Sequence, residues 1–569
     1  MEYLLVLLIA VPLVGAALTA LLSGRSARSW ALGVSGVTLL LGIILACNFS
    51  YGHAGDAITF GGEPGSLFAL PEIGFSLSLG LDAISLWLMV LTVALTPLAI
   101  WFSWGSIADR EKEYYGWMLV LLAAMVGAFI ARDLLLFYIF FELTLIPMFF
   151  IIGIWGGSQR RYAAAKFFLF TFAGSIFTLA GVLYLGLNAD SFAFADVFRY
   201  AQTQATANER FWLLLAFLAG LAVKVPLFPM HTWLPLAHTE APTAGSVILA
   251  GVLLKLGTYG LLAIALPVGL AGVSDSPEVV GHLFGWDITV PGFIKFLGVL
   301  CVIGIIYGAL VAWVQQDIKK LVAYSSVSHL GFCVLGLLAL NTIGMQGSVL
   351  YMINHGISTG AMFLVIGMIY DRYHTRDIDQ LSGLAKRMPI LAFFFILFTL
   401  SSIGLPGTNG FVSEFLSILG AFTSDNLGIA FGAVGALGVI LGAVYMLHMA
   451  ARVIWGPLKV PDAHAHGDPA KAAAGDDAHH DHAHDQPGDI GGREIAILVP
   501  LALAVFFLGL YPTPLMRSLE PALQRLTSVA VVEPAAPADS AIAVAENQAN
   551  IETIASAVIA DAPVEHQHD

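Results

Sequence analysis

Charged residues are scarce in this sequence. Asp, Glu, Lys and Arg make up only 11% of the 569 residues, whereas soluble chains carry about a quarter. The shortage is concentrated in apolar runs of about twenty residues that recur from Met1 to Tyr511, and each run is long enough to cross the hydrocarbon core of a bilayer. These runs exclude a string of soluble domains and predict one bundle of helices packed within a membrane.

Cysteine is nearly absent, and nucleotide-binding motifs are absent altogether. Cys47, Cys301 and Cys333 are far apart and form no CxxC pair, so an iron–sulfur cluster or a structural zinc site is not expected. The sequence has no GxxxxGK[ST], and no GxGxxG that opens a strand–helix unit. We therefore expect no cofactor and no metal site in this chain, and the formal charge of -14 argues against nucleic acid as a partner.

The apolar runs predict an all-α polytopic membrane protein of about fourteen transmembrane helices. We expect these spans at residues 2–22, 30–48, 80–102, 114–131, 133–154, 163–187, 211–238, 243–268, 291–313, 321–340, 346–370, 389–421, 428–456 and 494–511. Loops on one side would then hold seventeen of the 25 Lys and Arg residues, and loops on the other side only six. Because basic loops remain in the cytoplasm, both chain termini are expected in the periplasm of a bacterial inner membrane.

Residues 114–268 and 291–456 look like two units of five helices each. In both units a Pro/Gly element interrupts the fourth helix, AVKVPLFPMHTWLP in the first and SSIGLPGTNGFVSEF in the second. An odd number of helices per unit turns the second unit upside down, and inverted repeats with matching broken helices are typical of transporters. Proline breaks the hydrogen-bond ladder of a helix and frees carbonyls that can bind an ion or water. Ordinary proline kinks are the alternative, but two breaks at corresponding positions favour a transporter.

Four further regions complete the predicted organisation. Residues 1–113 are expected to form three N-terminal transmembrane helices, 493–511 the last one, and 512–569 an acidic periplasmic tail, while 457–492 form a His-rich cytoplasmic loop. Six histidines of this loop could bind zinc, nickel or copper. They are His464, His466, His479, His480, His482 and His484. Their spacing matches no structured site, and we favour a solvated loop.

Six ionisable side chains within the predicted spans are the candidates for a functional role, because charge is costly there. They are Glu142, Lys224, Lys255, His329, His355 and Glu414. A charge at the bilayer centre costs about 2.5–3.5 kcal/mol on insertion scales, so such residues face one another or water and typically mark proton paths. Burial favours the neutral form of an acid or a base, whereas a nearby opposite charge favours the ionised form. A buried Glu–Lys pair can therefore exchange a proton when the distance or hydration between its members changes, and the six residues together predict a proton relay.

A static role is the alternative for each of these residues. Glu142 with Lys224, and likewise Lys255 and Glu414, could form fixed buried ion pairs. Either relay histidine could merely hydrogen bond a neighbouring helix. His231 and His238 are interpreted as capping or interface residues, and His448 as a packed or interfacial histidine.

Three segments resemble the antiporter-like subunits of respiratory complex I, the proton-translocating NADH:quinone oxidoreductase. They are KVPLFPMHTWLPLAHTEAPTAGSVILAGVLLKLGTYGLL, DIKKLVAYSSVSHLGF and GLPGTNGFVSEF. The resemblance spans roughly residues 75–510. It implies that Glu142, Lys224 and Lys255 are the ionisable residues that the family shares in its fifth, seventh and eighth helices, and the family's central histidines match His329 and His355 less closely. Subunits L and N carry lysine in the broken twelfth helix, whereas subunit M (ND4-like) carries glutamate, so Glu414 indicates the subunit M type.

This resemblance implies a membrane-arm subunit that translocates protons while other subunits pass electrons from NADH to quinone. FMN, iron–sulfur clusters and quinone would be bound by those partner subunits, and L-like and N-like antiporter subunits would be its neighbours in the lipid bilayer. Two alternatives remain open. The chain could be a Na⁺/H⁺ antiporter subunit of the Mrp type, or a passive structural subunit whose buried charges only hold helices together. The His-rich loop and the tail after residue 512 depart from the family pattern.

Overall fold

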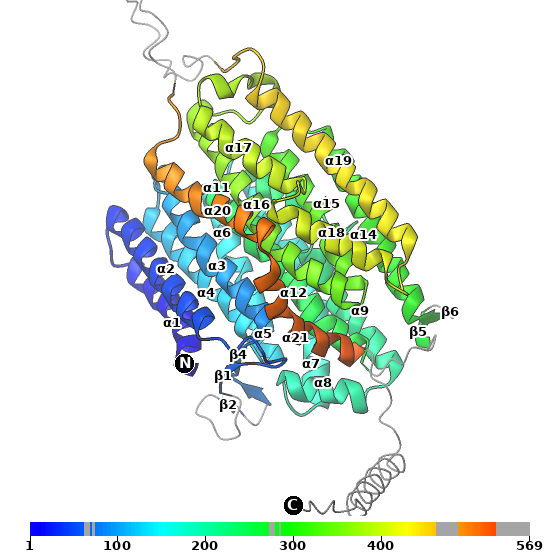
Figure 1. Cartoon of the computed structure of the whole chain (residues 1–569). Coiled ribbons are helices and arrows are strands. Elements are labelled where there is room, and N and C mark those ends of the chain that lie inside the picture. The colour runs from blue at the N-terminus through cyan, green and yellow to red at the C-terminus, as the bar shows by residue number, and fades with distance from the viewer. Residues whose placement is uncertain (62–68, 71–73, 272–278, 284–285, 462–486, 531–569) are drawn as a thin grey trace, which may run out of the picture.

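The computed structural model describes residues 1–61, 69–70, 74–271, 279–283, 286–461 and 487–530, and helices dominate it (Figure 1). Among these residues, twelve helices are long and apolar enough to cross a membrane. The prediction of a multi-pass, mainly α-helical membrane protein is therefore confirmed. The six histidines of the predicted loop lie outside the described residues.

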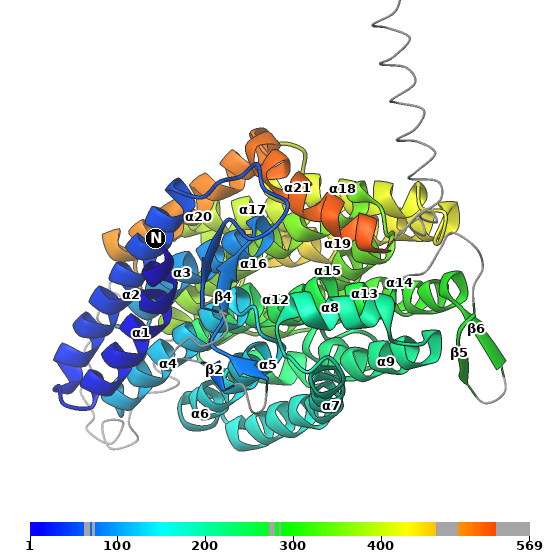
Figure 2. The ribbon, with the colours of Figure 1, turned by 90° about the horizontal axis from the view of Figure 1, so that it is seen from below.

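Four helices correspond to the first four predicted spans. They are α1 (Glu2–Thr19), α2 (Gly24–Cys47), α3 (Ala83–Phe102) and α4 (Glu111–Ile130). α1 and α2 lie together along one edge of the molecule (Figures 1 and 2). Capping side chains fix where several helices begin. Asp82 caps α3, and Asp317 and Asn341 cap α15 (Ile318–Leu338) and α16 (Thr342–Tyr373), each by accepting a hydrogen bond of 2.7–2.8 Å from a backbone N–H of the first turn.

The predicted fifth span is interrupted at Thr144. Its two pieces are α5 (Leu134–Leu143) and α6 (Leu145–Trp155). Two local features account for the interruption. The Thr144 hydroxyl donates to the Phe141 carbonyl oxygen at 2.7 Å, and Pro147 has no N–H to offer the Leu143 carbonyl. The predicted span over 133–154 is present as Leu134–Trp155, and its helix is interrupted at this threonine.

Both predicted helix breaks are observed. Residues 225–233 separate α9 (Ala207–Lys224) from α10 (Leu234–Glu240), and residues 403–408 separate α17 (Pro389–Ser402) from α18 (Asn409–Phe422). Prolines within the first break remove backbone donors. In the second break, Gly404 and Gly407 have φ angles of +69° and +92°, a backbone conformation that favours glycine. The inverted relation of the two five-helix units stays a prediction.

The predicted eighth span alternates between two helix types. It consists of α11 (Thr243–Ile248), η2 (Leu249–Leu253), α12 (Leu254–Gly260), η3 (Leu261–Ala265) and α13 (Leu266–Gly269). The segments η2 and η3 are π-helical, so their backbone bonds join residue i to residue i+5. Such segments are frequent at functional sites, and here they flank the predicted relay lysine of this span.

Three spans form the centre of the bundle: residues 243–269, α15 and α16. At least 94% of the apolar window of each is buried within the chain, compared with 28–44% for α1, α2, α7, α14, α19 and α20. The outer helices named for the first time here are α7 (Arg160–Asn188), α14 (Val290–Trp313), α19 (Ile429–Ile454) and α20 (Gly492–Leu510). Figure 2 shows α12, α15 and α16 in the middle of the bundle. An ionisable side chain on a central span is therefore shielded from lipid.

The remaining elements are short or lie at the ends of the bundle. Two amphipathic helices, α8 (Phe194–Thr203) and α21 (Thr513–Ala530), lie at the same end as the N-terminus (Figure 1). Two 3₁₀ turns are η4 (Ile378–Gln380) and η5 (Leu384–Lys386). Three antiparallel ladders, which the sequence did not predict, pair β1 (Ile58–Phe60) with β4 (Leu79–Leu81), β2 (Ala69–Leu70) with β3 (Phe75–Ser76), and β5 (Val279–Leu283) with β6 (Trp286–Thr289).

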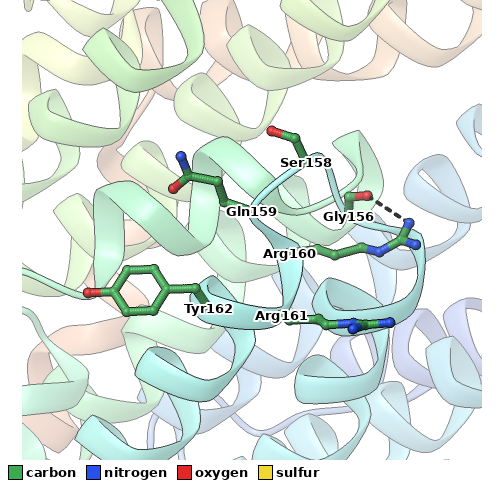
Figure 3. Close-up of a pocket in the computed structure, with 7 residues that line it drawn as sticks. Gly156, Ser158, Gln159, Arg160, Arg161 and Tyr162 are labelled. Carbon is green, nitrogen blue, oxygen red and sulfur yellow. Dashed lines mark hydrogen bonds between the residues drawn. The ribbon is translucent and has the colours of Figure 1, made fainter.

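The loop between α6 and α7 belongs to the side that is predicted to be basic. Figure 3 shows Arg160 and Arg161 at a pocket of about 720 Å³, where Arg160 Nη1 donates to the Gly156 carbonyl oxygen at 3.4 Å. Both arginines are exposed. None of the six predicted relay residues lines this pocket, which is a charged feature of the surface.

Candidate functional site

Lys224 lies at the first helix break. It is the last residue of α9, and it is only 3% exposed. Its Nζ donates to Thr144 Oγ1 at 3.1 Å and lies 4.4 Å from the centre of the Phe141 ring. A buried amine needs such an acceptor and such a ring face in place of water. Lys224 is therefore held against the junction of α5 and α6.

Glu142 belongs to the same junction, two residues before Thr144. Its Oε1 is buried without a hydrogen-bond partner in the described part of the chain, where no ion pair joins it to Lys224. The fixed ion pair considered as an alternative is thus not observed. Ile139 and Ile146 share a helix face with Glu142 and are 47% and 44% exposed. Glu142 therefore lies close to an outer surface of the chain.

Lys255 is fully buried in α12, between the two π-helical segments. Its Nζ donates to the carbonyl oxygen of Ala250, which belongs to η2, and lies 2.8 Å from His355 Nδ1. A charged amine can only donate, so His355 Nδ1 accepts whenever Lys255 is protonated. The lysine and the histidine are thus in direct hydrogen-bond contact, which is the geometry that proton exchange requires.

His355 and His329 lie side by side in the core. Their ring centres are 5.6 Å apart, and the residues are 3% and 5% exposed. His355 Nε2 has no hydrogen-bond partner among the described residues. His329 Nε2 lies 3.3 Å from the Tyr445 hydroxyl. The two predicted histidines therefore share one buried site, with one imidazole nitrogen left to take up or release a proton.

Glu414 is joined to these histidines by a tyrosine. Its Oε1 accepts a hydrogen bond of 2.8 Å from the Tyr351 hydroxyl. Tyr351 precedes His355 by four residues on α16, and their ring centres are 6.5 Å apart. A Cβ at position 404 would collide with Glu414 Oε2, so Gly404 lets the second helix break approach the carboxylate closely. The glutamate is therefore placed between the break and the histidine pair.

The structure thus divides the six predicted residues into two clusters. Four of them form one cluster: Lys255, His355, His329 and Glu414. Glu142 and Lys224 form the other. The helices carrying the two lysines touch at Gly257, where a Cβ would lie 3.1 Å from Lys224 Cβ. No hydrogen bond joins the two amines within the described residues.

Several polar residues of these clusters were missed by the sequence reasoning. Thr144 and Tyr351 were not singled out, although each is near a predicted residue in the same helix. A polar network at the second break was also missed. In this network Ser401 Oγ donates to Asn409 Oδ1 at 2.6 Å, and Asn354 Nδ2 donates to the Asn409 carbonyl oxygen at 2.7 Å. Spacing could have pointed to Tyr351, since residues four apart share a helix face.

His238 and Lys319 are more buried than the sequence suggested. His238 is fully buried, stacks on Phe363 with ring centres 4.8 Å apart, and has no hydrogen-bond partner at either ring nitrogen in the described chain. Lys319 was assigned to a basic loop, yet it is 4% exposed in the first turn of α15 and donates to the carbonyl oxygen of Ala241. His238 is thus a packed residue of the core, while Lys319 satisfies a carbonyl at the start of the eighth span.

A buried arginine, Arg132, forms a hydrogen bond near the C-terminal end of α12. Arg132, between α4 and α5, donates from Nε to Asp56 Oδ2 at 2.6 Å and from Nη1 to the Tyr259 hydroxyl at 3.2 Å. Burial by itself lowers the pKa of the Arg132 guanidinium, but the charges of Asp56 and Asp82 outweigh this and hold that pKa well above its usual value. Because Tyr259 follows Lys255 by four residues, this network fixes the helix that carries the lysine.

The described residues contain no group of three or more His, Cys, Asp or Glu side chains that could hold a metal ion. Carboxylates, amines, imidazoles and phenols make up the two clusters. The chemistry that these groups share is the binding and release of protons. Lys255, His329 and His355 lie on the three spans whose apolar windows are at least 94% buried within the chain, so these groups can exchange protons away from lipid.

Residues 131–440 match the model of the NADH:quinone oxidoreductase/Mrp antiporter transmembrane family, and the chain belongs to this family. It is 39% identical over 546 residues to NADH-quinone oxidoreductase subunit M of Rhodobacter capsulatus, covering 92% of this chain and 96% of the relative. It is 38% identical over 458 residues to NADH-ubiquinone oxidoreductase chain 4 of Marchantia polymorpha, covering 80% and 84%. The predicted relationship to the subunit M type is therefore confirmed.

Solved structures share the fold over nearly the whole chain. A chain of respiratory complex I from Thermus thermophilus with bound NADH superposes with a TM-score of 0.76 at 28% identity, covering 92% of this chain and 99% of that one. A chain of the Mrp complex from Dietzia superposes with a TM-score of 0.77 at 24% identity, covering 93% and 98%. The second likeness is evidence of a common fold alone.

Proposed function

We propose that this chain is the membrane-arm subunit that translocates protons in an NADH:quinone oxidoreductase, and that its proton path runs through the two clusters. The path residues are Glu142, Lys224, Lys255, His329, His355 and Glu414. One observation carries the proposal. Hydrogen bonds and ring contacts lead from Lys255 through His355 and Tyr351 to Glu414, and all four side chains are buried. Such buried ionisable chains are typical of proton relays.

Each cluster has its own part in the proposed path. Lys255 exchanges its proton with His355 Nδ1, and Glu414 receives protons beside the second helix break. Glu142, near the outer surface, changes charge together with the neighbouring subunit, and Thr144 links that change to Lys224. A charge that appears or disappears at Glu142 alters the stability of the Lys224 ammonium, since both lie in a medium of low dielectric constant.

The redox reaction is assigned to partner subunits. FMN, iron–sulfur clusters and quinone are bound there, and L-like and N-like antiporter subunits flank this chain in the bilayer. The chain lies in a bacterial inner membrane. Both termini lie in the periplasm, a proposal that the distribution of Lys and Arg among the loops supports. The six regions predicted from the sequence, 1–113, 114–268, 291–456, 457–492, 493–511 and 512–569, are the proposed organisation.

Replacing Tyr351 by phenylalanine is expected to slow NADH-driven proton transport about tenfold, because a hydrogen bond to a charged group contributes about 1.5–3 kcal/mol. The measurement is NADH-dependent acidification in proteoliposomes that contain the whole complex, with the quinone reduction rate followed in parallel. Tyr115→Phe is the matched control, since the Tyr115 hydroxyl is buried and has no hydrogen-bond partner among the described residues. Equal transport by the two variants in fully assembled complexes would refute a role for Tyr351.

The Mrp-type alternative is tested with sodium. Proteoliposomes containing the complex are loaded with a pH-sensitive dye, and a Na⁺ gradient is imposed without NADH. We expect no Na⁺-dependent pH change, because the chain belongs with subunit M and Glu414 stands where antiporter-like relatives are expected to carry lysine. A Na⁺-dependent proton flux that the Glu414→Gln variant abolishes would favour the antiporter.

A further inference from the structure

A deep apolar crevice lies against α16, the helix that carries His355. It has a volume of about 960 Å³ and is walled by α3, α16, α20 and the start of α21. Leu95, Ile353 and Leu501 line it and are at most 5% exposed, whereas Phe507 at its rim is 58% exposed. The crevice therefore reaches from the lipid-facing surface of the chain to its core. We call it the α20–α21 crevice.

The polar groups of the α20–α21 crevice are satisfied, with one exception. Trp87 Nε1 donates to Ser518 Oγ at 2.9 Å, Ser518 Oγ donates to the Leu515 carbonyl oxygen at 2.6 Å, and the Tyr51 hydroxyl donates to a backbone carbonyl at 2.8 Å. Arg517 also lines the crevice. It is exposed and makes no ion pair with any residue in the described part of the chain. Among the described residues, Arg517 is thus a cationic side chain without an ion-pair partner at the edge of the apolar crevice.

The position of α21 puts this cation at the membrane interface. α21 begins three residues after α20 ends, and it packs across α3, α13 and α16 at the end of the bundle. Leu515, Leu519 and Leu523 of α21 are buried, while Arg517 and Glu520 face outward. An amphipathic helix with this pattern lies in the plane of the interface, where lipid headgroups are.

The lining of the crevice limits what can fill it. Water is a poor occupant, since its ordered sites need several polar partners, and the polar groups named above are already paired with one another or with backbone carbonyls. Flexible hydrocarbon chains need no polar partner and adapt to an irregular apolar space. The exposed Arg517 favours a negative charge at one end of such a ligand.

We propose that the α20–α21 crevice binds the acyl tails of an anionic phospholipid whose phosphate pairs with Arg517. The tails pack against Ile353 and Ile357, which lie on the side of α16 opposite His355. The bound lipid therefore fills the space behind the helix that carries the relay histidine and Tyr351. Removal of the lipid takes away the atoms that pack against Ile353 and Ile357 from the crevice side.

The test uses the whole complex, purified and stripped of loosely bound lipid. Native mass spectrometry counts the phosphatidylglycerol molecules that remain bound and measures rebinding of added phosphatidylglycerol and phosphatidylcholine. Arg517→Gln is expected to weaken phosphatidylglycerol rebinding at this site about fivefold, because one basic residue near a lipid surface contributes about 1 kcal/mol. Phosphatidylcholine rebinding is expected to stay unchanged.

Ala504→Phe, which fills the crevice, is expected to remove one retained lipid per complex. Two matched controls are expected to bind as the parent does. Arg199→Gln removes another exposed arginine at the same end of the bundle, and Ala17→Phe adds the same ring to an exposed position of α1. Equal lipid counts in Ala504→Phe and in the controls would overturn the proposal. A photoreactive residue at position 504 that cross-links to another subunit, instead of to lipid, would overturn it as well.

Discussion

Glu142→Gln is expected to lower NADH:quinone reduction and coupled proton transport together, each by about a hundredfold, the lower end of the range for loss of an acid–base group. The substitution keeps the shape of the side chain and removes its ability to ionise. Glu142 has an unsatisfied buried oxygen and sits two residues from the threonine that holds Lys224. A fixed amide at this position can no longer alter the charge that Lys224 experiences. Both rates are expected to fall because a pump whose proton step is blocked also retards the electron transfer that drives it.

The control for this experiment is Glu113→Gln. Glu113 is an exposed carboxylate that pairs with Arg110 on the surface, so its loss costs little. Complex content is quantified in both strains before the rates are compared. Undiminished proton transport by a fully assembled Glu142→Gln complex would support the passive structural role instead.

Lys255→Met is expected to abolish proton transport to below about a tenth of the parent rate, with a smaller effect on assembly. Lys255 is the only hydrogen-bond partner of His355 Nδ1 among the described residues, and methionine has no proton to exchange with that nitrogen. Because the lysine is fully buried, its replacement by an apolar side chain removes a group that is costly to bury. Lys112→Met, at an exposed position of α4, is the matched control.

Lys255→Arg separates proton exchange from simple positive charge. Arginine keeps the charge and does not release its proton under physiological conditions. A relay lysine therefore cannot be replaced by arginine, whereas a static cation could be, once assembly is shown to be intact. Transport by Lys255→Arg at the parent rate would contradict the relay.

The positions of the membrane-spanning helices could be predicted from the sequence because each span leaves its own signal. Apolar runs located the helices, and the prolines and glycines around Pro226 and Gly404 located both breaks. The six candidate relay residues could be singled out because a charge in an apolar run is conspicuous whatever its partners are. Hydropathy could not show that Lys255, His329, His355 and Glu414 gather in one cluster. Nor could it show that Glu142 and Lys224 form a separate second cluster. Both groupings depend on how helices that are distant in sequence pack against one another.

Several structural features could not be predicted, because neither hydropathy nor a charged residue in the sequence marks them. Thr144 and Tyr351 are ordinary residues for an apolar helix, and only their contacts with Lys224 and Glu414 distinguish them. The interruption at Thr144 follows from one side-chain hydrogen bond and a proline three residues later, a combination that most membrane helices absorb as a kink. The helix α21 was read as part of an acidic tail, because its even mixture of polar and apolar residues lowers its mean hydropathy.

Two π-helical segments flank Lys255. The direction of its side chain therefore depends on the number of residues in this span more than on which side chains surround it. Each segment accommodates one residue more per turn than a regular helix does, and one residue corresponds to about 100° of rotation. Ala250, whose carbonyl oxygen the amine meets, lies in the first of these wider turns. A relative with one residue fewer between Thr243 and Lys255 would point its lysine elsewhere, even if every other side chain were unchanged. Insertions and deletions in this span therefore carry more information about the path than substitutions do.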